Sequence, residues 1–327
     1  MRAGLFHQLS PSSLAAFSRI LRGKKIKPAS RRSPAGVKAK ASRLLIISTG
    51  AGSITPEIEK KLRELFADHL IVPFDPDDDF TRLITPRAQV VVAGGDGSIE
   101  FVVRKLADTN HPLAILSLGT FNNFALSLGL PTDLDQQIRV AKTGRPRAIT
   151  LGRVNGRVFI EACAIGLFGE TIALGESAKD REYGAFVQDL RNVVRAKRFK
   201  YELEGDLSGS GVAMSLLFAN TASTGARLPV GDGMPTDRYL EFSVHAGKSR
   251  TDIAARAVAS ALLMKHKEDA GQVFKFRSLT VKTAPKVKTY ADNMLVGPTP
   301  ATVTAETSAL KVVLPRTARR VRSTSTA

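Results

Sequence analysis

The sequence contains a single cysteine, Cys163, and no tryptophan. One cysteine excludes a disulfide within the chain and fits a reducing compartment. No apolar run approaches the roughly 18 residues that a membrane-spanning helix needs. The strings GxGxxG and GxxxxGK[ST] are also absent, so the sequence carries neither a dinucleotide fingerprint nor a P-loop.

Acidic residues are missing from both ends of the chain. Residues 1–41 contain ten Lys or Arg and no acid, and residues 315–327 contain four Arg and no acid. The net charge is +18, which leaves about +4 for the residues between these ends. Because a nucleic-acid-binding domain more often carries its charge on a folded face, we expect no nucleic-acid partner.

The basic N-terminal segment, residues 1–41, is expected to be an extension. Four apolar residues at helical spacing precede most of its basic ones: Leu14, Phe17, Ile20 and Leu21. A short basic amphipathic helix can rest on an anionic membrane surface. The composition also suits an organelle transit peptide, and a disordered extension is the third alternative.

The most informative motif is a glycine turn between an apolar strand and a helix. Val90–Ala93 predicts a buried strand, after which Gly94, Gly95 and Gly97 surround Asp96. An apolar helical pattern follows. Backbone N–H groups at a helix N-terminus bind phosphate, and an acid in the turn indicates an accompanying cation.

A second glycine turn follows the next apolar strand, Leu113–Leu118. The turn reads Gly119-Thr120-Phe121-Asn122-Asn123, and its Thr and Asn side chains suit a ribose or a phosphate. The helix behind it is expected to end at Gly129. Two such units predict adjacent parallel strands whose carboxyl ends meet where open α/β sheets bind ligands.

The two motifs resemble those of the diacylglycerol kinase catalytic-domain family. GGDGS followed by LGTFNNFALSLGLP is similar to the family's GGDGT and LGTGNDFA. The family includes bacterial lipid kinases, sphingosine kinases and ceramide kinase, and is a distant relative of NAD kinases. The resemblance covers roughly residues 43–316 through further segments: Val154–Ile160, Ala164–Gly166, Phe218–Asn220 and Ala309–Pro315.

The expected fold class is α/β plus β. Strands and helices alternate up to about residue 147, which predicts an N-terminal three-layer α/β/α nucleotide-binding domain. Short alternating strands follow and predict a C-terminal antiparallel β-sandwich, an arrangement like that of NAD kinases and diacylglycerol kinases. The expected limits are a basic extension at 1–41, a nucleotide-binding domain at 42–147, a lipid-substrate sandwich at 148–316, whose end returns to the first domain, and a basic tail at 317–327.

The resemblance implies the cofactors ATP and Mg²⁺ and a set of residues that bind them. The expected nucleotide site comprises both turns: Gly94, Gly95, Asp96, Gly97, Ser98, Glu100, Gly119, Thr120, Asn122 and Asn123. Asp96 is also expected to act in catalysis, near the metal-bound nucleotide. A structural cation is implied at Asp237, with the carbonyls of Met234 and Tyr239.

The sequence departs from the family pattern near its C-terminus. The family's DGE element carries the carboxylate taken as the general base, but the corresponding residues are Asp292-Asn293-Met294. Methionine cannot accept a proton, so either Asp292 or another acid is the base, or the chain is a weak kinase or an inactive one. Glu100 and Phe101 stand where Asn and Glu are usual, and Asn123 where Asp is common.

The leading hypothesis is an ATP-dependent lipid kinase that transfers the γ-phosphate to a diacylglycerol-like or sphingoid hydroxyl. The alternatives are a nucleotide- or lipid-binding homologue without turnover and, less favoured, an NAD kinase. We expect a cytoplasmic protein at the inner membrane surface with a lipid as partner; a homodimer is left open. The acceptor lipid is not specified by the sequence, because acceptor pockets are generic in composition.

Overall fold

The computed structural model describes residues 40–50, 54–169, 198–225, 228–246 and 272–316. Residues 1–39 of the basic extension, for which the amphipathic helix is one alternative, and the basic tail lie outside these residues. The sequence also shows helical apolar patterns at 186–197 and 253–265, which lie outside them as well. Among the described residues, no helix is both long enough and apolar enough to cross a membrane.

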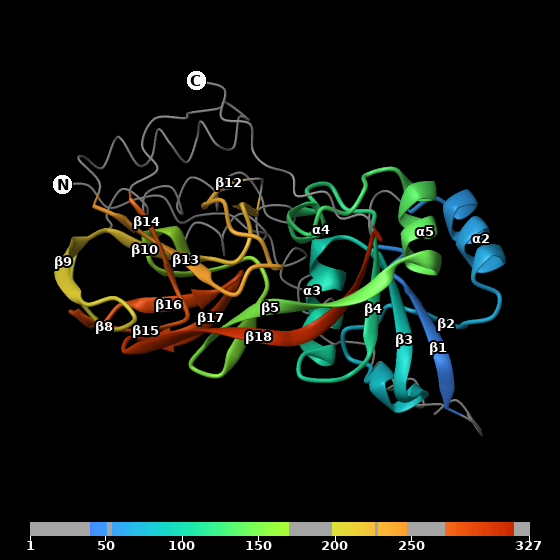
Figure 1. Ribbon diagram of the computed structural model, residues 1–327, viewed down its shortest axis with the longest axis horizontal. Coiled ribbons are helices and arrows are strands. Elements are labelled where there is room, and N and C mark those ends of the chain that lie inside the picture. Colours follow the sequence, from blue (N-terminus) through green and yellow to red (C-terminus); the bar gives the residue numbers. More distant parts are fainter. Residues whose placement is uncertain (1–39, 51–53, 170–197, 226–227, 247–271, 317–327) are drawn as a thin grey trace, which may run out of the picture. The chain divides into compact units, whose positions relative to one another are not determined.

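The first half of the described chain forms three layers (Figure 1). Four parallel strands lie in the order β2 (Leu70–Pro73), β1 (Ala41–Ile47), β3 (Ile84–Gly94) and β4 (Pro112–Ser117). Helices α3 (Asp96–Leu106) and α4 (Asn123–Ser127) pack on one face of the sheet, and α2 (Pro56–Leu65) and α5 (Leu134–Thr143) on the other. The expected α/β/α layering is confirmed.

Alternation along the strands explains why both faces are apolar. Leu44 and Val90 contribute to the core beneath α3, whereas their neighbours Leu45 and Val91 contribute to the core beneath α2. All four side chains are fully buried. A parallel strand covered on both faces therefore has a continuous run of hydrophobic residues in its sequence.

Local signals set the helix ends. Thr55 caps α2 by accepting the Ile58 N–H, and Pro56 occupies the first turn. Asp133 caps α5 by accepting the Gln136 N–H. Gly129 has φ +71°, which fits the predicted stop there.

The antiparallel strands form a sandwich. β5 (Arg145–Val154), β6 (Arg157–Phe159), β8 (Phe199–Gly205), β9 (Gly209–Ala213), β15 (Ser278–Ala284) and β18 (Ala301–Leu314) belong to the same sheet as β1–β4. The opposing sheet has the order β14 (Val273–Phe276), β13 (Leu240–His245), β10 (Ser215–Ala219), β7 (Ala162–Gly166), β16 (Lys288–Ala291) and β17 (Met294–Pro298). A core that includes Phe218, Phe242 and Val281 lies between the sheets, so the expected sandwich is confirmed.

Strand β18 belongs to both parts of the fold. Its first half pairs with β15, and its second half runs parallel to β4, while β5 pairs with it along most of its length. The ladder shifts between Glu306 and Leu310, where Ser308 has φ +64°. The expected closing strand, Ala309–Pro315, is therefore only the second half of a strand of 14 residues. The boundary expected at residue 148 falls inside β5, and the domain limits stay a prediction.

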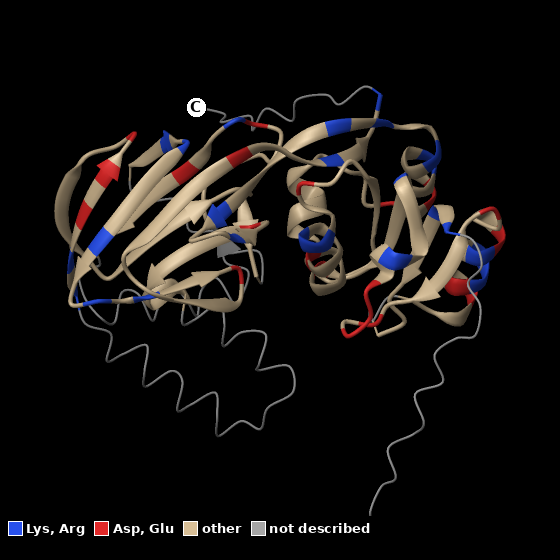
Figure 2. Cartoon of the chain, turned by 90° about the horizontal axis from the view of Figure 1, so that it is seen from below, with Lys and Arg blue, Asp and Glu red and all other residues tan. Residues whose placement is uncertain are grey.

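Small elements complete the described chain. A short 3₁₀ helix, η1 (Phe80–Leu83), precedes β3, and a two-stranded ribbon joins β11 (Ser223–Thr224) to β12 (Leu228–Pro229). Basic and acidic residues are interspersed on the antiparallel strands (Figure 2). One such pair is Lys282 of β15 with Glu204 of β8.

Candidate active site

The first glycine turn connects β3 to α3, as expected. Gly95 is the N-cap residue of α3, and Asp96 opens the helix. A Cβ on Gly94 would lie 3.0 Å from the Cβ atoms of both Ser48 and Ser98. The Ser98 hydroxyl donates to Ser48 Oγ at 2.8 Å in the buried interior. Gly94 and Ser98 therefore pack this turn against the end of β1, and the Ser98 side chain is satisfied within the protein.

The second turn packs directly on the first. Asp96 Oδ2 accepts the Asn122 N–H at 2.9 Å. The Asn122 side chain in turn accepts the Gly119 N–H and donates to the Gly119 carbonyl, both at 2.9 Å. A Cβ on Gly119 would lie only 2.8 Å from Gly95 Cα. The predicted juxtaposition of the two turns is thus confirmed. Asn122, at φ 54°, stabilises the second turn through its two side-chain hydrogen bonds to Gly119.

The remaining residues of the predicted nucleotide site divide into open and engaged ones. Gly97 and Thr120 are exposed, and a Cβ on Gly97 would meet nothing within 4 Å. Glu100 pairs with Arg104 on the same helix at 2.5 Å. Asn123 is buried, accepts from Ser223 Oγ at 2.8 Å and donates to the Gly225 carbonyl at 2.7 Å. The open surface thus consists of the first turn of α3 and the Thr120 hydroxyl.

A matched pair of glycine substitutions separates packing from ligand space. We expect Gly119→Ala to lower the free energy of unfolding by about 1–3 kcal/mol, since the methyl group pushes the two turns apart. Gly97→Ala has room and is expected to leave stability within about 1 kcal/mol of wild type. Its methyl group would nevertheless occupy space above the start of α3, so ATP affinity should fall. Thermal unfolding and ATP titration of both variants check this; equal stability of the two would contradict the close packing.

Asp292 is held by four donors in the turn between β16 and β17. Its Oδ1 accepts the N–H groups of Glu161 and Ala162 at 2.9 and 3.1 Å. Its Oδ2 accepts the Ile160 N–H at 3.0 Å and Arg104 Nη2 at 3.1 Å. Burial raises the pKa of this carboxyl, and the Arg104 charge and the three N–H groups oppose that shift. Asp292 therefore joins the sandwich to α3.

Arg104 makes the other side of this contact. It bridges Glu100 and Asp292, and its Nη1 lies 3.4 Å from Met294 Sδ. Its side chain is 20% exposed and that of Asp292 only 7%. Arg104 was not singled out from the sequence.

Glu161 is a further residue that the sequence analysis missed. It lies between β6 and β7 and is only 8% exposed. Its Oε2 accepts from Thr224 Oγ1 at 2.8 Å and from the Gly225 N–H at 3.1 Å, with Asn123 Nδ2 at 3.5 Å. Burial, followed by the charges of Asp292 and Asp96, raises its pKa to about 8. The one available signal was a lone acid inside the apolar run 158–165.

The residues expected to hold a structural cation lie on a separate segment. The Met234 carbonyl accepts the Asp237 N–H at 2.8 Å, and the Asp237 carbonyl accepts the Thr150 hydroxyl. Tyr239 is 42% exposed and lies against the Arg277 guanidinium. Within the described ranges, no group of three or more His, Cys, Asp or Glu side chains could hold a metal ion. The cation at this segment stays a prediction.

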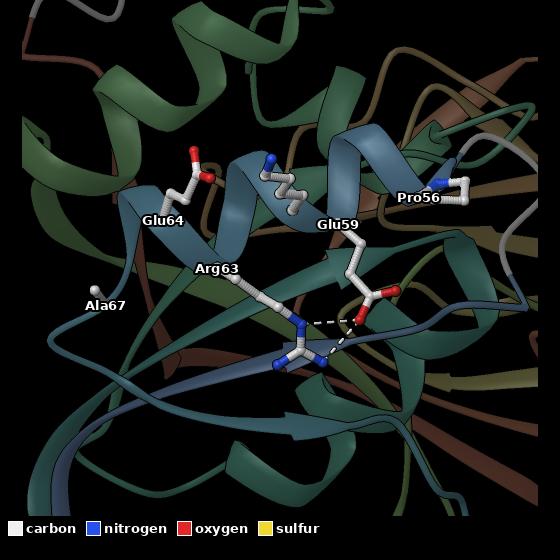
Figure 3. A pocket seen from close by; sticks show the side chains of 6 residues that line it. Pro56, Glu59, Arg63, Glu64 and Ala67 are labelled. Atoms are coloured by element: carbon white, nitrogen blue, oxygen red, sulfur yellow. Dashed lines mark hydrogen bonds and ion pairs between the residues drawn. The ribbon is translucent and has the colours of Figure 1, made fainter.

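One surface depression lies elsewhere, along α2 (Figure 3). Its lining residues are Pro56, Glu59, Lys60, Arg63, Glu64 and Ala67. Within it, Arg63 Nη2 pairs with Glu59 Oε1 at 2.7 Å. All of these residues belong to α2 or the turn after it, so the depression shares none with the glycine turns.

Curated proteins share part of this sequence. The chain is 34% identical over 139 residues to a Klebsiella pneumoniae protein named "probable lipid kinase YegS-like", an alignment covering 39% of this chain and 46% of the relative. It is 26% identical over 223 residues to a protein of the same name from Yersinia pestis, covering 62% and 75%. An uncharacterized Synechocystis protein is 24% identical over 238 residues, covering 69% and 54%. In the first and last cases the chain spans about half the length of the relative.

Solved structures share the fold. A crystal structure of a Bacillus anthracis diacylglycerol kinase superposes with a TM-score of 0.63 at 19% identity, covering 86% of this chain and 99% of that one. Residues 47–154, which contain both glycine turns, match the model of the diacylglycerol kinase catalytic domain. The match to this family model therefore covers the part of the chain that contains the two glycine turns, and the curated relatives extend the similarity beyond it.

Proposed function

We propose that this protein is an ATP-dependent lipid kinase. The observation that carries the proposal is the contact of two glycine turns at the carboxyl ends of β3 and β4, fixed by the hydrogen bond from Asn122 to Asp96. The N–H groups at the start of α3 would bind the phosphates of ATP, since a helix N-terminus attracts anions. The exposed Thr120 hydroxyl would donate to the same phosphates.

Mg²⁺ fits this site through Asp96. The ion is usually bound by one or two carboxylates together with substrate phosphates and water, so one carboxylate at the phosphate turn is a sufficient protein contribution. The cation would offset the charge of the transferring phosphoryl group.

The acceptor would be a lipid hydroxyl that enters beside the sandwich, near Asp292. Support for a lipid comes from the similar Klebsiella pneumoniae and Yersinia pestis proteins, which are named as probable lipid kinases. The basic segments at 1–41 and 315–327 would draw the enzyme to an anionic membrane surface at about 1 kcal/mol per basic residue near it. Both diacylglycerol-like and sphingoid acceptors fit this proposal.

A second candidate is a nucleotide-binding homologue without transfer. It is favoured by one observation: the Asp292 carboxylate is paired with Arg104, and Met294 stands beside them in place of an acid. Methionine cannot serve as a base.

Transfer of radiolabelled γ-phosphate from ATP with Mg²⁺ into a panel of lipid micelles tests the proposal. Asp96→Asn keeps an acceptor for the Asn122 N–H but removes the charge, so we expect at least about 100-fold less transfer with little change in stability. Asp77→Ala, in an exposed acidic loop, is the control and should transfer normally.

The outcomes separate the two candidates. Label in one lipid class that is lost in Asp96→Asn supports the kinase. ATP binding without label in any lipid favours the second candidate. Absence of ATP binding overturns both.

A further inference from the structure

Glu161 lies where the two parts of the candidate site meet. Its neighbour Asn123 is the first residue of α4 and directly follows Asn122 in the second glycine turn. The N–H of Glu161 itself donates to Asp292 at 2.9 Å. The charges of both Asp96 and Asp292 act on its carboxyl group. The side chain is therefore positioned between the phosphate-binding turns and the residue beside which the acceptor lipid is proposed to enter.

The hydrogen bonds of Glu161 engage one oxygen only. Thr224 and Gly225 donate to Oε2, and the Asn123 amide is closest to the same atom. Within the described part of the chain, no donor reaches Oε1. The carboxyl group is thus oriented by three contacts and retains an oxygen able to accept a proton.

The other acidic groups nearby are engaged differently. Asp292 accepts from four donors, one of them the Arg104 guanidinium. Glu100 pairs with the same guanidinium. Both oxygens of Asp292 already accept from these donors, so Asp292 is suited to positioning the peptide of Glu161.

We propose that Glu161 is the general base of the proposed lipid kinase. The inference rests on that function. The lipid hydroxyl oxygen forms a bond to the γ-phosphorus while the bond from that phosphorus to the β,γ-bridging oxygen breaks, and ADP leaves with the electron pair. The hydroxyl proton passes to Glu161 Oε1, which becomes a neutral carboxylic acid and later returns the proton to solvent. Asp292 is then a positioning residue.

The electrostatic setting gives this proposal a pH signature. Glu161 has a pKa of about 8, raised by burial and by the charges of Asp292 and Asp96. The nearby cation is Arg104, which pairs with both Asp292 and Glu100. Most molecules therefore carry a protonated Glu161 at pH 7, and the basic form increases as the pH rises. We expect the rate of transfer to rise through about pH 8.

The pH profile of kcat for wild type, Glu161→Gln and Glu161→Asp tests the proposal. A positioned general base contributes a factor of about 10²–10⁴ to the rate. Glu161→Gln should therefore lose at least about 100-fold in kcat, and its pH profile should lack the limb, that is, the rise of kcat near pH 8. Its ATP affinity should be unchanged. Glu161→Asp should recover part of kcat with a shifted limb. Glu241→Gln is the matched control, because Glu241 is also a buried acid that accepts a backbone N–H, from Asp232.

Each result has a distinct reading. Loss of the limb in Glu161→Gln alone supports the general base. If Glu161→Gln transfers phosphate fully and its rate still rises near pH 8, this inference is overturned but the proposed kinase is not. If Glu161→Gln loses kcat equally at every pH, Glu161 has a structural role, and the inference is again overturned while the proposed kinase stands. Absence of transfer by the wild type overturns the proposed function and this inference with it.

Discussion

Replacing Arg104 by alanine is expected to lower the free energy of unfolding by about 3 kcal/mol, because removing one partner of a buried ion pair leaves an uncompensated charge. In this case two acids lose their cation: Glu100, at 2.5 Å, and Asp292, at 3.1 Å. Asp292 retains its three backbone N–H groups, which keeps the expected loss at the lower end of the usual range. For a chain of this length, a fall in melting temperature of about 5 °C corresponds to it.

The exposed pair on α2 is the control for this measurement. Arg63 pairs with Glu59 one helical turn away, and their side chains are 49% and 28% exposed (Figure 3). Arg63→Ala should cost no more than about 0.5 kcal/mol, as is usual for surface pairs. Equal losses in the two variants would show that the Arg104 contacts contribute no more than a surface ion pair.

Glu161→Gln should change how stability depends on pH. The pKa of Glu161 is raised from 4.5 to about 8 in the folded protein. The folded state thus binds this proton more tightly than the unfolded chain does, so the stability it contributes is fully present below about pH 4.5 and is lost as the pH rises through 8. The largest change this shift allows is about 5 kcal/mol. Glutamine does not titrate, so the variant should gain on the wild type from pH 5 to pH 8.

Melting temperatures of wild type and variant across that pH range provide the measurement. The difference between them should move by up to about 10 °C in favour of Glu161→Gln. Glu64→Gln, on the exposed face of α2, is expected to follow the wild type at every pH. A difference for Glu161→Gln that is constant with pH would mean that Glu161 does not titrate in this range in the folded protein. This result is independent of whether the protein transfers phosphate.

The glycine turns were predictable because their signals are local. A buried strand, three glycines around an acid and a helical pattern lie within one short stretch, and the same order recurs at Gly119. Both turns form, and their contact follows from the parallel pairing of β3 with β4. The roles assigned to their residues in binding ATP stay predictions.

Arg104 and Glu161 escaped sequence reasoning because their contacts are distant in the chain. Arg104 binds Asp292, and Glu161 is held by residues at 123, 224 and 225. A basic residue in the last turn of a helix is ordinary, so nothing marked Arg104. In the sequence, Glu161 stands between two apolar segments. Its side chain has polar partners because the chain passes from one sheet to the other between β6 and β7.

The length of β18 was underestimated for a related reason. Its alternation is interrupted where the ladder shifts, between Glu306 and Leu310. The sequence therefore indicated only the apolar stretch beyond the shift. The strand also includes the residues before the shift, because its first half pairs with β15 whereas its second half pairs with β4.

This strand also determines when the parallel sheet can be completed. Lys311 of β18 lies opposite Pro112 of β4, across about two hundred intervening residues. During synthesis, β1–β4 emerge from the ribosome long before their last neighbour exists, so β4 has an open edge until residues 301–314 are made. Unpaired edges invite association with other chains, and pairings of high sequence separation form slowly. The open edge of β4 is thus exposed to such association until β18 has been made.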